Sequence, residues 1–120
     1  MMTIDEVSNL QKECCDHYEA ALIPPTEELL VVISKGVYEG VVPIEGVRYP
    51  SPKHMSGWWL TTDEYDGNTE SLITVHYSHI VEKRPEVAIY MALPFGYRFL
   101  LGGEEDCVWF DTEVAEEDID

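Results

Sequence analysis

The chain has few basic residues. It contains 7 Lys and Arg against 24 Asp and Glu in 120 residues, a formal net charge of −17. Such a negative surface repels the phosphate backbone of nucleic acids and anionic membranes, and it speeds encounters with basic proteins through long-range attraction. The charge therefore argues against nucleic-acid and membrane binding and favours a basic protein partner. It does not by itself separate a protein-binding module from a domain whose acids serve solubility.

Long apolar runs are also lacking. None approaches the roughly 20 residues that a membrane-spanning helix needs. The first residues, 1–6, become acidic at once and do not show the basic-then-apolar order of a signal peptide. Hydrophobic residues make up 45% of the chain, which is typical of a folded protein. We therefore expect a single cytoplasmic domain over residues 1–120, with no membrane association.

Cysteine is scarce, and no CxxC pair is present. The three cysteines are Cys14, Cys15 and Cys107. An odd number with two adjacent thiols fits a reducing compartment better than a disulfide framework. We expect at least Cys14 and Cys107 to act as small buried hydrophobic residues.

The motifs of several enzyme classes are missing. There is no GxSxG nucleophile motif, and the acids that follow Gly102 and Gly103 would repel a phosphate. His76 and His79 form an HxxH pair, but zinc motifs add further ligands nearby, so we expect two partly buried histidines that make local hydrogen bonds. A thiol–imidazole pair of Cys107 with His79 is disfavoured because we expect the thiol to be buried beside a carboxylate. We expect a non-enzymatic protein without cofactor or metal; the alternative is a small metal-dependent hydrolase that uses His76 and His79.

The first segment predicts a helix over residues 4–21. Thr3 followed by Glu6 is a capping box, in which each side chain accepts a hydrogen bond from a backbone N–H that would otherwise be unpaired. Apolar residues then recur at gaps of three or four, and Pro24 ends the pattern. The expected apolar stripe consists of Ile4, Val7, Leu10, Cys14, Tyr18 and Ala21.

The rest of the chain reads mainly as strands. Gly36 marks a bulge or bend in the first, and Pro43 makes the second an edge or loop-like segment. Ser78 caps a short helix, and a further helix begins at Pro85 and ends at Pro94. The residues from 112 to 120 form an acidic tail that we expect to be frayed or loosely docked. The class is α+β: an antiparallel sheet with the N-terminal helix and a second short helical segment on one face. The expected strands are 29–38, 41–48, 57–61, 72–77 and a hairpin of 97–101 with 107–110.

Aromatic residues are too numerous to lie entirely in the core. Adjacent Trp58 and Trp59 must face opposite sides of a strand, so one is buried and the other is not. Phe99 and Trp109 are expected in the core. Exposed aromatic residues ringed by acids would suit a basic partner.

Six segments in the second and third parts of the chain form a recognisable pattern: Pro43–Pro50, Ser56–Trp59, His76–Ile80, Arg84–Val87, Leu93–Phe99 and Glu105–Asp111. Together they resemble the immunity protein 33 family, whose members are partners of polymorphic bacterial toxins. The resemblance covers about residues 40–114, and it departs from the family pattern at Cys107, where another apolar or aromatic residue is expected.

The resemblance implies a non-enzymatic inhibitor that binds a toxin made by the same or a neighbouring cell. Immunity families of this kind are often acidic because many toxin domains are basic nucleases, which agrees with the charge. Pro85, Pro94 and Gly96 are expected to be structural, since they lie at the ends of elements. The resemblance itself therefore assigns no toxin-binding residue.

The residues themselves suggest where such a partner would bind. Acids cluster in one polar loop after the tryptophan pair and in the turn of the final hairpin. Charge pairs there would raise the association rate, and desolvated aromatic residues would hold the complex. An acidic interaction subunit of another complex shares this logic and differs only in its partner. The predicted contact residues are Trp58, Asp63, Glu64, Asp66, Glu70, Glu104, Glu105 and Asp106.

Overall fold

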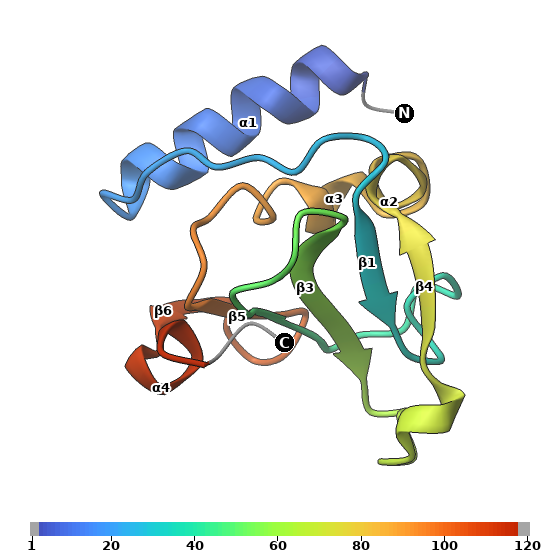
Figure 1. Cartoon of the computed structure of the whole chain (residues 1–120). Coiled ribbons are helices and arrows are strands. Elements are labelled where there is room, and N and C mark those ends of the chain that lie inside the picture. Colours follow the sequence, from blue (N-terminus) through green and yellow to red (C-terminus); the bar gives the residue numbers. More distant parts are fainter. Residues whose placement is uncertain (1–2, 118–120) are drawn as a thin grey trace.

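The computed structural model describes residues 3–117, which form helices around a six-stranded sheet (Figure 1). The α+β class predicted from the sequence is confirmed. The helices are α1 (Ile4–His17), α2 (Tyr77–Lys83), α3 (Pro85–Ala88) and α4 (Thr112–Ala115), with a short 3-10 helix η1 (Thr69–Ser71). The strands are β1 (Leu30–Ile33), β2 (Ile44–Arg48), β3 (Met55–Thr62), β4 (Ile73–His76), β5 (Tyr97–Leu101) and β6 (Cys107–Phe110).

The sheet is mostly antiparallel. Its strand order is β4-β1-β3-β2-β5-β6, and only β1 and β3 run parallel. The predicted hairpin is present as β5 and β6. Because β2 has a hydrogen-bonded strand on each side, it is an interior strand and not the edge strand that Pro43 suggested. Pro43 lies just before the first residue of β2, so its missing N–H removes no bond from the ladder.

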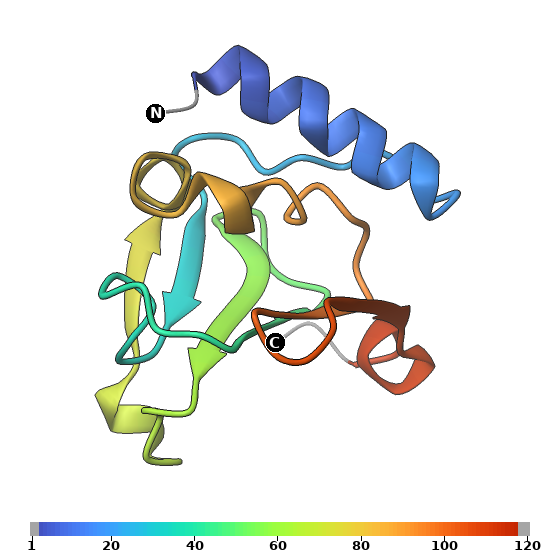
Figure 2. The same ribbon diagram turned by 180° about the vertical axis from the view of Figure 1, so that it is seen from behind.

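One face of the sheet is covered by α2, α3 and the turns after them, and α1 packs on α3 (Figures 1 and 2). We call it the covered face. Its side chains Ile44, Trp58, Leu60 and Phe99 are fully buried. A Cβ on Gly46 would collide with the Phe99 ring, so the glycine makes room for that ring in the core. The opposite face, which we call the open face, carries the alternate residues of the same strands.

A buried arginine joins four segments under the covered face. Arg48 is 2% exposed, and its Nε donates to the Ser56 carbonyl at 2.9 Å. Its Nη1 donates to the carbonyls of Ile23 and Leu93 at 2.6 and 2.7 Å, and the guanidinium lies 4.6 Å from the centroid of the Phe95 ring. Burial lowers the pKa of Arg48 to about 10. Arg48, which lies in the segment Pro43–Pro50 that resembles the family, therefore connects segments of the fold.

Helix α1 is shorter than expected. It ends at His17 rather than near Ala21, with Tyr18 as C-cap and Glu19 at φ 54°. Thr3 caps the helix as predicted, since its hydroxyl accepts from the Glu6 N–H at 3.1 Å. The Glu6 carboxylate accepts from that hydroxyl instead of a backbone N–H.

The buried stripe of α1 is also displaced from the expected one. It consists of Val7, Gln11 and Cys15, whereas Ile4 is 57% exposed. A polar residue thus occupies the centre of the buried face. The apolar spacing could not reveal this, because the partners of Gln11 lie far along the chain at Tyr77 and Ala88.

Three further boundaries differ from the sequence prediction. The first strand ends at Ile33, because residues 35–40 form turns in which Gly36 takes φ 92°. Helix α2 begins at Tyr77 with His76 as its N-cap, so Ser78 is not the cap. Helix α3 stops at Ala88.

The acidic tail is partly docked. Asp111 caps α4 by accepting from the backbone N–H groups of Glu113 and Val114 at 3.0 and 3.4 Å, and Val114 is buried. The expectation of a frayed or loose tail is therefore wrong for residues 112–117. Residues 118–120 lie outside the described residues.

The cysteines are arranged differently from the prediction. Cys15 is buried, Cys14 is half-buried and Cys107 is exposed, and all three are free thiols. Cys107 begins the edge strand β6, where one side has no neighbouring strand, and its predicted burial is therefore wrong. Burial, helped by the neighbouring Cys15, raises the pKa of Cys14 to about 11.

Candidate partner-binding surface

The two predicted acidic segments lie at the same end of the sheet. The first, residues 63–71, follows the last residue of β3, and the second, residues 102–106, follows the last residue of β5. Thr62 and Leu101 both pair with Ile44, so both segments leave the sheet beside the start of β2. We call this region the acidic end. Its predicted contact acids are all exposed: Asp63, Glu64, Asp66, Glu70, Glu104, Glu105 and Asp106.

Two of these acids have structural tasks. Asp66 Oδ1 accepts from the Asn68 N–H at 2.8 Å and from the Ser71 hydroxyl at 3.0 Å, and these bonds lower its pKa. Asp106 Oδ1 accepts from the Gly102 N–H at 2.9 Å. Both carboxylates therefore hold their own turns.

The other five acids have no such task. Within residues 3–117, no hydrogen bond or ion pair engages their carboxylates, which are those of Asp63, Glu64, Glu70, Glu104 and Glu105. These side chains are free to meet a basic partner.

The tryptophan pair is split as the strand geometry requires, but Trp58 is the buried member. Its indole N–H donates to the Met91 carbonyl at 2.8 Å, and its side chain is 0% exposed. Trp58 is therefore not part of the surface, which corrects its choice as a contact residue. Trp59 is 37% exposed on the open face and lies edge-on to Tyr49, with ring centroids 6.1 Å apart.

A row of paired residues, which we call the aromatic row, crosses four strands of the open face; Trp59 and Trp109 at its two ends are exposed, whereas Val47 is buried. Trp59 pairs with Val47, Val47 with Arg98, and Arg98 with Trp109. Trp109 is 39% exposed, so its predicted place in the core is wrong. The cause is register: Phe99 pairs with Val108, which puts Trp109 on the opposite face from Phe99.

Arg98 organises this row. Its guanidinium forms ion pairs with Glu45 and, at 3.1 Å, with Asp111, and it lies 5.4 Å from the centroid of the Trp109 ring. Sequence reasoning missed the group. The alternation of residues 97–101 contained the signal, since Arg98 must face away from Phe99.

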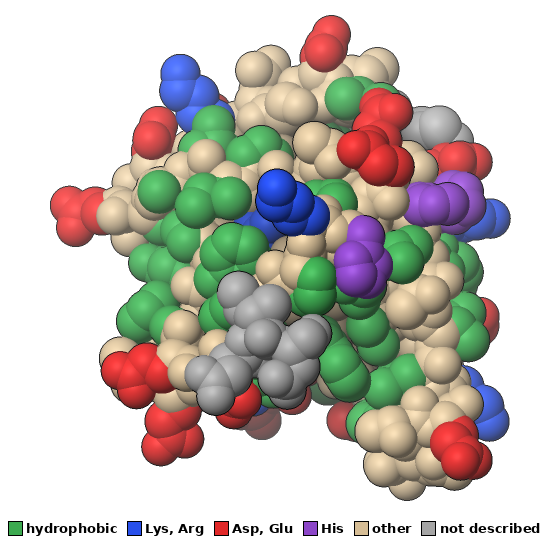
Figure 3. Space-filling model, viewed as in Figure 1, with side chains coloured by type: hydrophobic (Ala, Val, Ile, Leu, Met, Phe, Trp, Pro, Cys, Tyr) green, Lys and Arg blue, Asp and Glu red, His purple; other side chains and the backbone are tan. Residues whose placement is uncertain are grey.

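The open face adjoins the acidic end. A small cavity of about 60 Å³ is lined by Glu45 and Thr61 of the open face and by Asp63 of the acidic end. Figure 3 shows hydrophobic side chains gathered over much of the middle of the molecule, whereas most of the visible Asp and Glu stand near its outline. Trp59 and Thr61 lie on the same face of β3, so the exposed indole is two residues along the strand from this junction.

The two histidines of the HxxH pair are neighbours in space. The ring centroids of His76 and His79 are 5.6 Å apart, and both residues are exposed, so the expectation of partly buried histidines is wrong. In the described part of the chain, no group of three or more His, Cys, Asp or Glu is arranged to hold a metal ion. Two imidazoles alone fall short of the three or four protein ligands of zinc sites.

A membrane-crossing helix was not expected. Among the helices within residues 3–117, none combines the length and the apolar character needed to span a bilayer.

Two residues of the segments that resemble the family have roles in the fold. Gly96 takes φ 96°, and a Cβ there would lie 2.6 Å from the Phe110 ring. Pro85 occupies the first turn of α3, where it needs no N–H partner. The structural roles expected for these two residues agree with their positions.

Comparison with known proteins gives one match. The model of the Imm33-like domain family matches residues 10–111, well over half of the chain and further toward the N-terminus than the resemblance in the sequence extended. No curated protein and no solved structure gives a significant match. The chain therefore belongs to the Imm33-like family of immunity protein domains.

Proposed function

We propose that this chain is a non-enzymatic immunity protein that binds and neutralises a basic bacterial toxin domain. Membership of the Imm33-like family is the observation that carries the proposal. The net charge of −17 supports a basic partner, because opposite charges steer association. Basic nuclease domains are one class of toxin with this charge.

The binding surface that we propose consists of the acidic end and the adjoining aromatic row of the open face. Free carboxylates such as Asp63 and Glu64 would raise the association rate. Exposed Trp59 and Trp109 would supply the desolvated anchors that dominate interface energies. This division of labour predicts binding that weakens as salt is added.

We place the protein in the cytoplasm. Cys14, Cys15 and Cys107 are all free thiols, and free thiols persist in reducing compartments. Periplasmic fractionation of the source cell tests this placement.

The first experiment is a pull-down from the source cell's lysate at low salt, followed by a high-salt wash and mass spectrometry of the eluate. We expect one basic protein that inhibits growth when it is expressed alone. Capture of a basic but harmless protein would favour an acidic subunit of another complex. Failure to capture any basic protein would contradict the proposal.

Matched variants then test the proposed surface. Neutralising Asp63, Glu64 and Glu70 together should slow association with the captured partner by about tenfold at low salt. The control neutralises three exposed acids of α1 and its C-terminal end, Glu13, Asp16 and Glu19, which gives the same change in net charge. Equal effects of the two triple variants would show that only the overall charge matters and would reject the acidic end as the contact site.

A further inference from the structure

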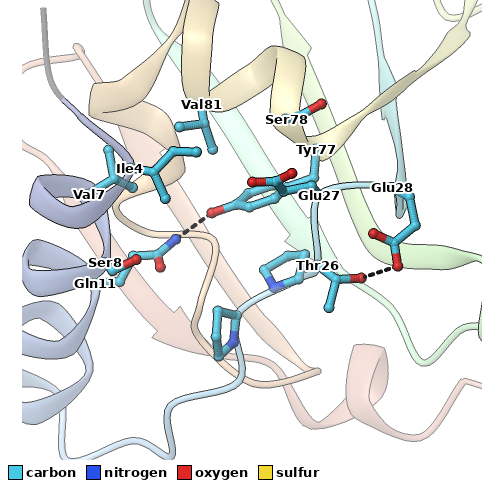
Figure 4. A pocket seen from close by; sticks show the side chains of 12 residues that line it. Ile4, Val7, Ser8, Gln11, Thr26, Glu27, Glu28, Tyr77, Ser78 and Val81 are labelled. Atoms are coloured by element: carbon cyan, nitrogen blue, oxygen red, sulfur yellow. Dashed lines mark hydrogen bonds between the residues drawn. The ribbon is translucent and has the colours of Figure 1, made fainter.

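A pocket lies beside α1, away from the acidic end (Figure 4). It has a volume of about 410 Å³ and lies between the N-terminal half of α1, the segment 24–28 and the start of α2. Its size falls in the range of pockets that bind small molecules or single peptide side chains with their flanking backbone. Segments far apart in the sequence thus meet around one cavity.

The walls of this pocket are apolar, and its mouth is acidic. Val7, Pro25 and Val81 line the walls. Glu27 and Glu28 stand at the mouth, both exposed, and no Lys or Arg is among the described lining residues. The Thr26 hydroxyl donates to Glu28 Oε1 at 2.9 Å. Hydrogen bonds from the Glu28 N–H and, to a smaller degree, from this hydroxyl hold the pKa of Glu28 below its usual range.

A buried amide in the pocket is left without a partner for its oxygen. Gln11 is 3% exposed, and its Nε2 donates to the Ala88 carbonyl at 2.8 Å and to the Tyr77 hydroxyl. Because the Ala88 carbonyl can only accept, the amide nitrogen must face it, and the orientation of the amide is settled. Among the described residues, nothing donates to Gln11 Oε1.

The phenol beside this amide has spare capacity as well. Tyr77 is 6% exposed, and its oxygen accepts one hydrogen bond from Gln11, which leaves a second lone pair. Figure 4 shows the Tyr77 ring reaching from α2 toward Gln11, and Glu27 lines the same pocket from the segment 24–28. Within the described part of the chain, the oxygen of Gln11 and the second lone pair of Tyr77 are therefore both free to accept from a donor that enters the pocket.

We propose that this pocket accepts a basic side chain, Arg or Lys, from the toxin partner. The inference rests on the proposed function and names a second contact within it. The methylene groups of the side chain would lie along Val7 and Val81, and its cationic head would donate to Gln11 Oε1 and meet the Glu27 carboxylate. A long side chain with an apolar stem and a cationic head satisfies both the walls and the mouth.

The test uses two probes that differ only in charge. N-acetyl-arginine N-methylamide is titrated into the whole protein and followed by heteronuclear NMR, with N-acetyl-citrulline N-methylamide as the neutral isostere. We expect saturable shifts of the Gln11 side-chain amide and of Tyr77 and Val81 with the arginine probe, and affinity at least about fivefold weaker with citrulline. Equal binding of both probes, or shifts centred on the acidic end, would overturn the inference.

Variants at the pocket mouth complete this test. The double variant Glu27→Gln with Glu28→Gln should weaken the arginine probe at least about fivefold, whereas Glu13→Gln with Glu19→Gln, in α1 and just after its C-terminal end, should leave it unchanged. All four glutamates are exposed, so both variants are expected to fold. The protein is also diluted without any probe. If the signals of Gln11, Tyr77 and Val81 move on dilution, a second copy of the chain occupies the pocket, and this result would also overturn the inference.

Failure of the pocket inference can be distinguished from failure of the proposed function. The probe titration needs no toxin, whereas the pull-down needs no intact pocket. If the chain captures and neutralises a basic toxin but the arginine probe does not bind at Gln11, the pocket inference is wrong and the immunity function stands. If the probe binds but no basic toxin is captured, the pocket stands as a cation site and the proposed function is wrong.

Discussion

The two faces of the sheet use the same residue types in opposite ways. On the covered face, Arg48 pairs in register with Trp58, and both are buried. On the open face, Arg98 pairs with Trp109, and both are partly exposed. Arg48 is held by backbone carbonyls, whereas Arg98 is held by carboxylates.

The difference separates a face whose arginine serves stability from the face that we propose for binding. A buried guanidinium among carbonyls connects segments and cannot be reached by a partner. A partly exposed guanidinium that pairs with carboxylates and lies over an indole orders the surface around it, but it contributes little to the free energy of unfolding. The predictions below would break or sharpen this division.

The largest effect is expected at the tryptophan pair. Trp58→Ala should lower the free energy of unfolding by about 3–5 kcal/mol, because it empties a fully buried site. Trp59→Ala should lower it by about 1 kcal/mol, since Trp59 is 37% exposed and loses mainly its contact with Tyr49. Urea denaturation of both variants checks this, and similar losses would mean that the open face is as important to the core as the covered face.

The arginine pair should give the next largest difference. Arg48→Met keeps much of the volume but leaves the carbonyls of Ile23, Ser56 and Leu93 without their donor, and we expect a loss of about 2–4 kcal/mol. Arg98→Met removes a partly exposed ion-pair group and should cost at most about 1 kcal/mol. The comparison fails if thermal or urea unfolding ranks the two arginines in the opposite order.

The thiols should distinguish exposed from buried positions without changing the fold. Cys107 is exposed, whereas Cys15 is buried and the pKa of Cys14 is raised to about 11. A maleimide reagent at neutral pH should label Cys107 at least about tenfold faster than the other two, because the reactive form is an accessible thiolate. Peptide mapping by mass spectrometry reads out each site, and faster labelling at Cys14 would contradict the described packing of α1.

The smallest effect concerns acid pH. Hydrogen bonding from Arg98, followed by the N–H groups of Val114 and Glu113, holds the pKa of Asp111 below its usual range. Because the folded pKa is lowered, Asp111 stabilises α4 above the unfolded pKa of about 3.9, and this contribution is lost as the pH falls through the folded pKa. The protection factor of the Val114 amide, which corrects for the intrinsic effect of pH on exchange, should therefore fall below about pH 4 in the wild type and depend less on pH in Asp111→Asn.

Local patterns foretold the fold class, the Thr3 cap and the final hairpin, because each is encoded by neighbouring residues. The position of β2 in the middle of the sheet could not be foretold, since it depends on β5 pairing with β2 from far along the chain. The buried roles of Gln11 and Arg48 were not predicted for the same reason: their hydrogen-bond partners lie far along the chain. The division of Trp58 from Trp59 followed from strand geometry, but which of them is buried depended on where α2 and α3 pack.

The acids were easier to locate than the aromatic residues. Loop composition identified the segments 63–71 and 102–106, and strand register then placed both at one end of the sheet. Trp109 was assigned to the wrong face because its side is set by the register of a hairpin whose pairing the composition does not fix.

Growth rescue tests the central claim most directly. The basic toxin captured by the pull-down is expressed in a sensitive bacterium with wild-type chain, with the Asp63, Glu64 and Glu70 neutralised variant, or with no immunity protein. We predict survival with the wild type, reduced survival with the variant at equal protein level, and death without it. Death of cells that hold folded wild-type chain in excess over the toxin would contradict the immunity function.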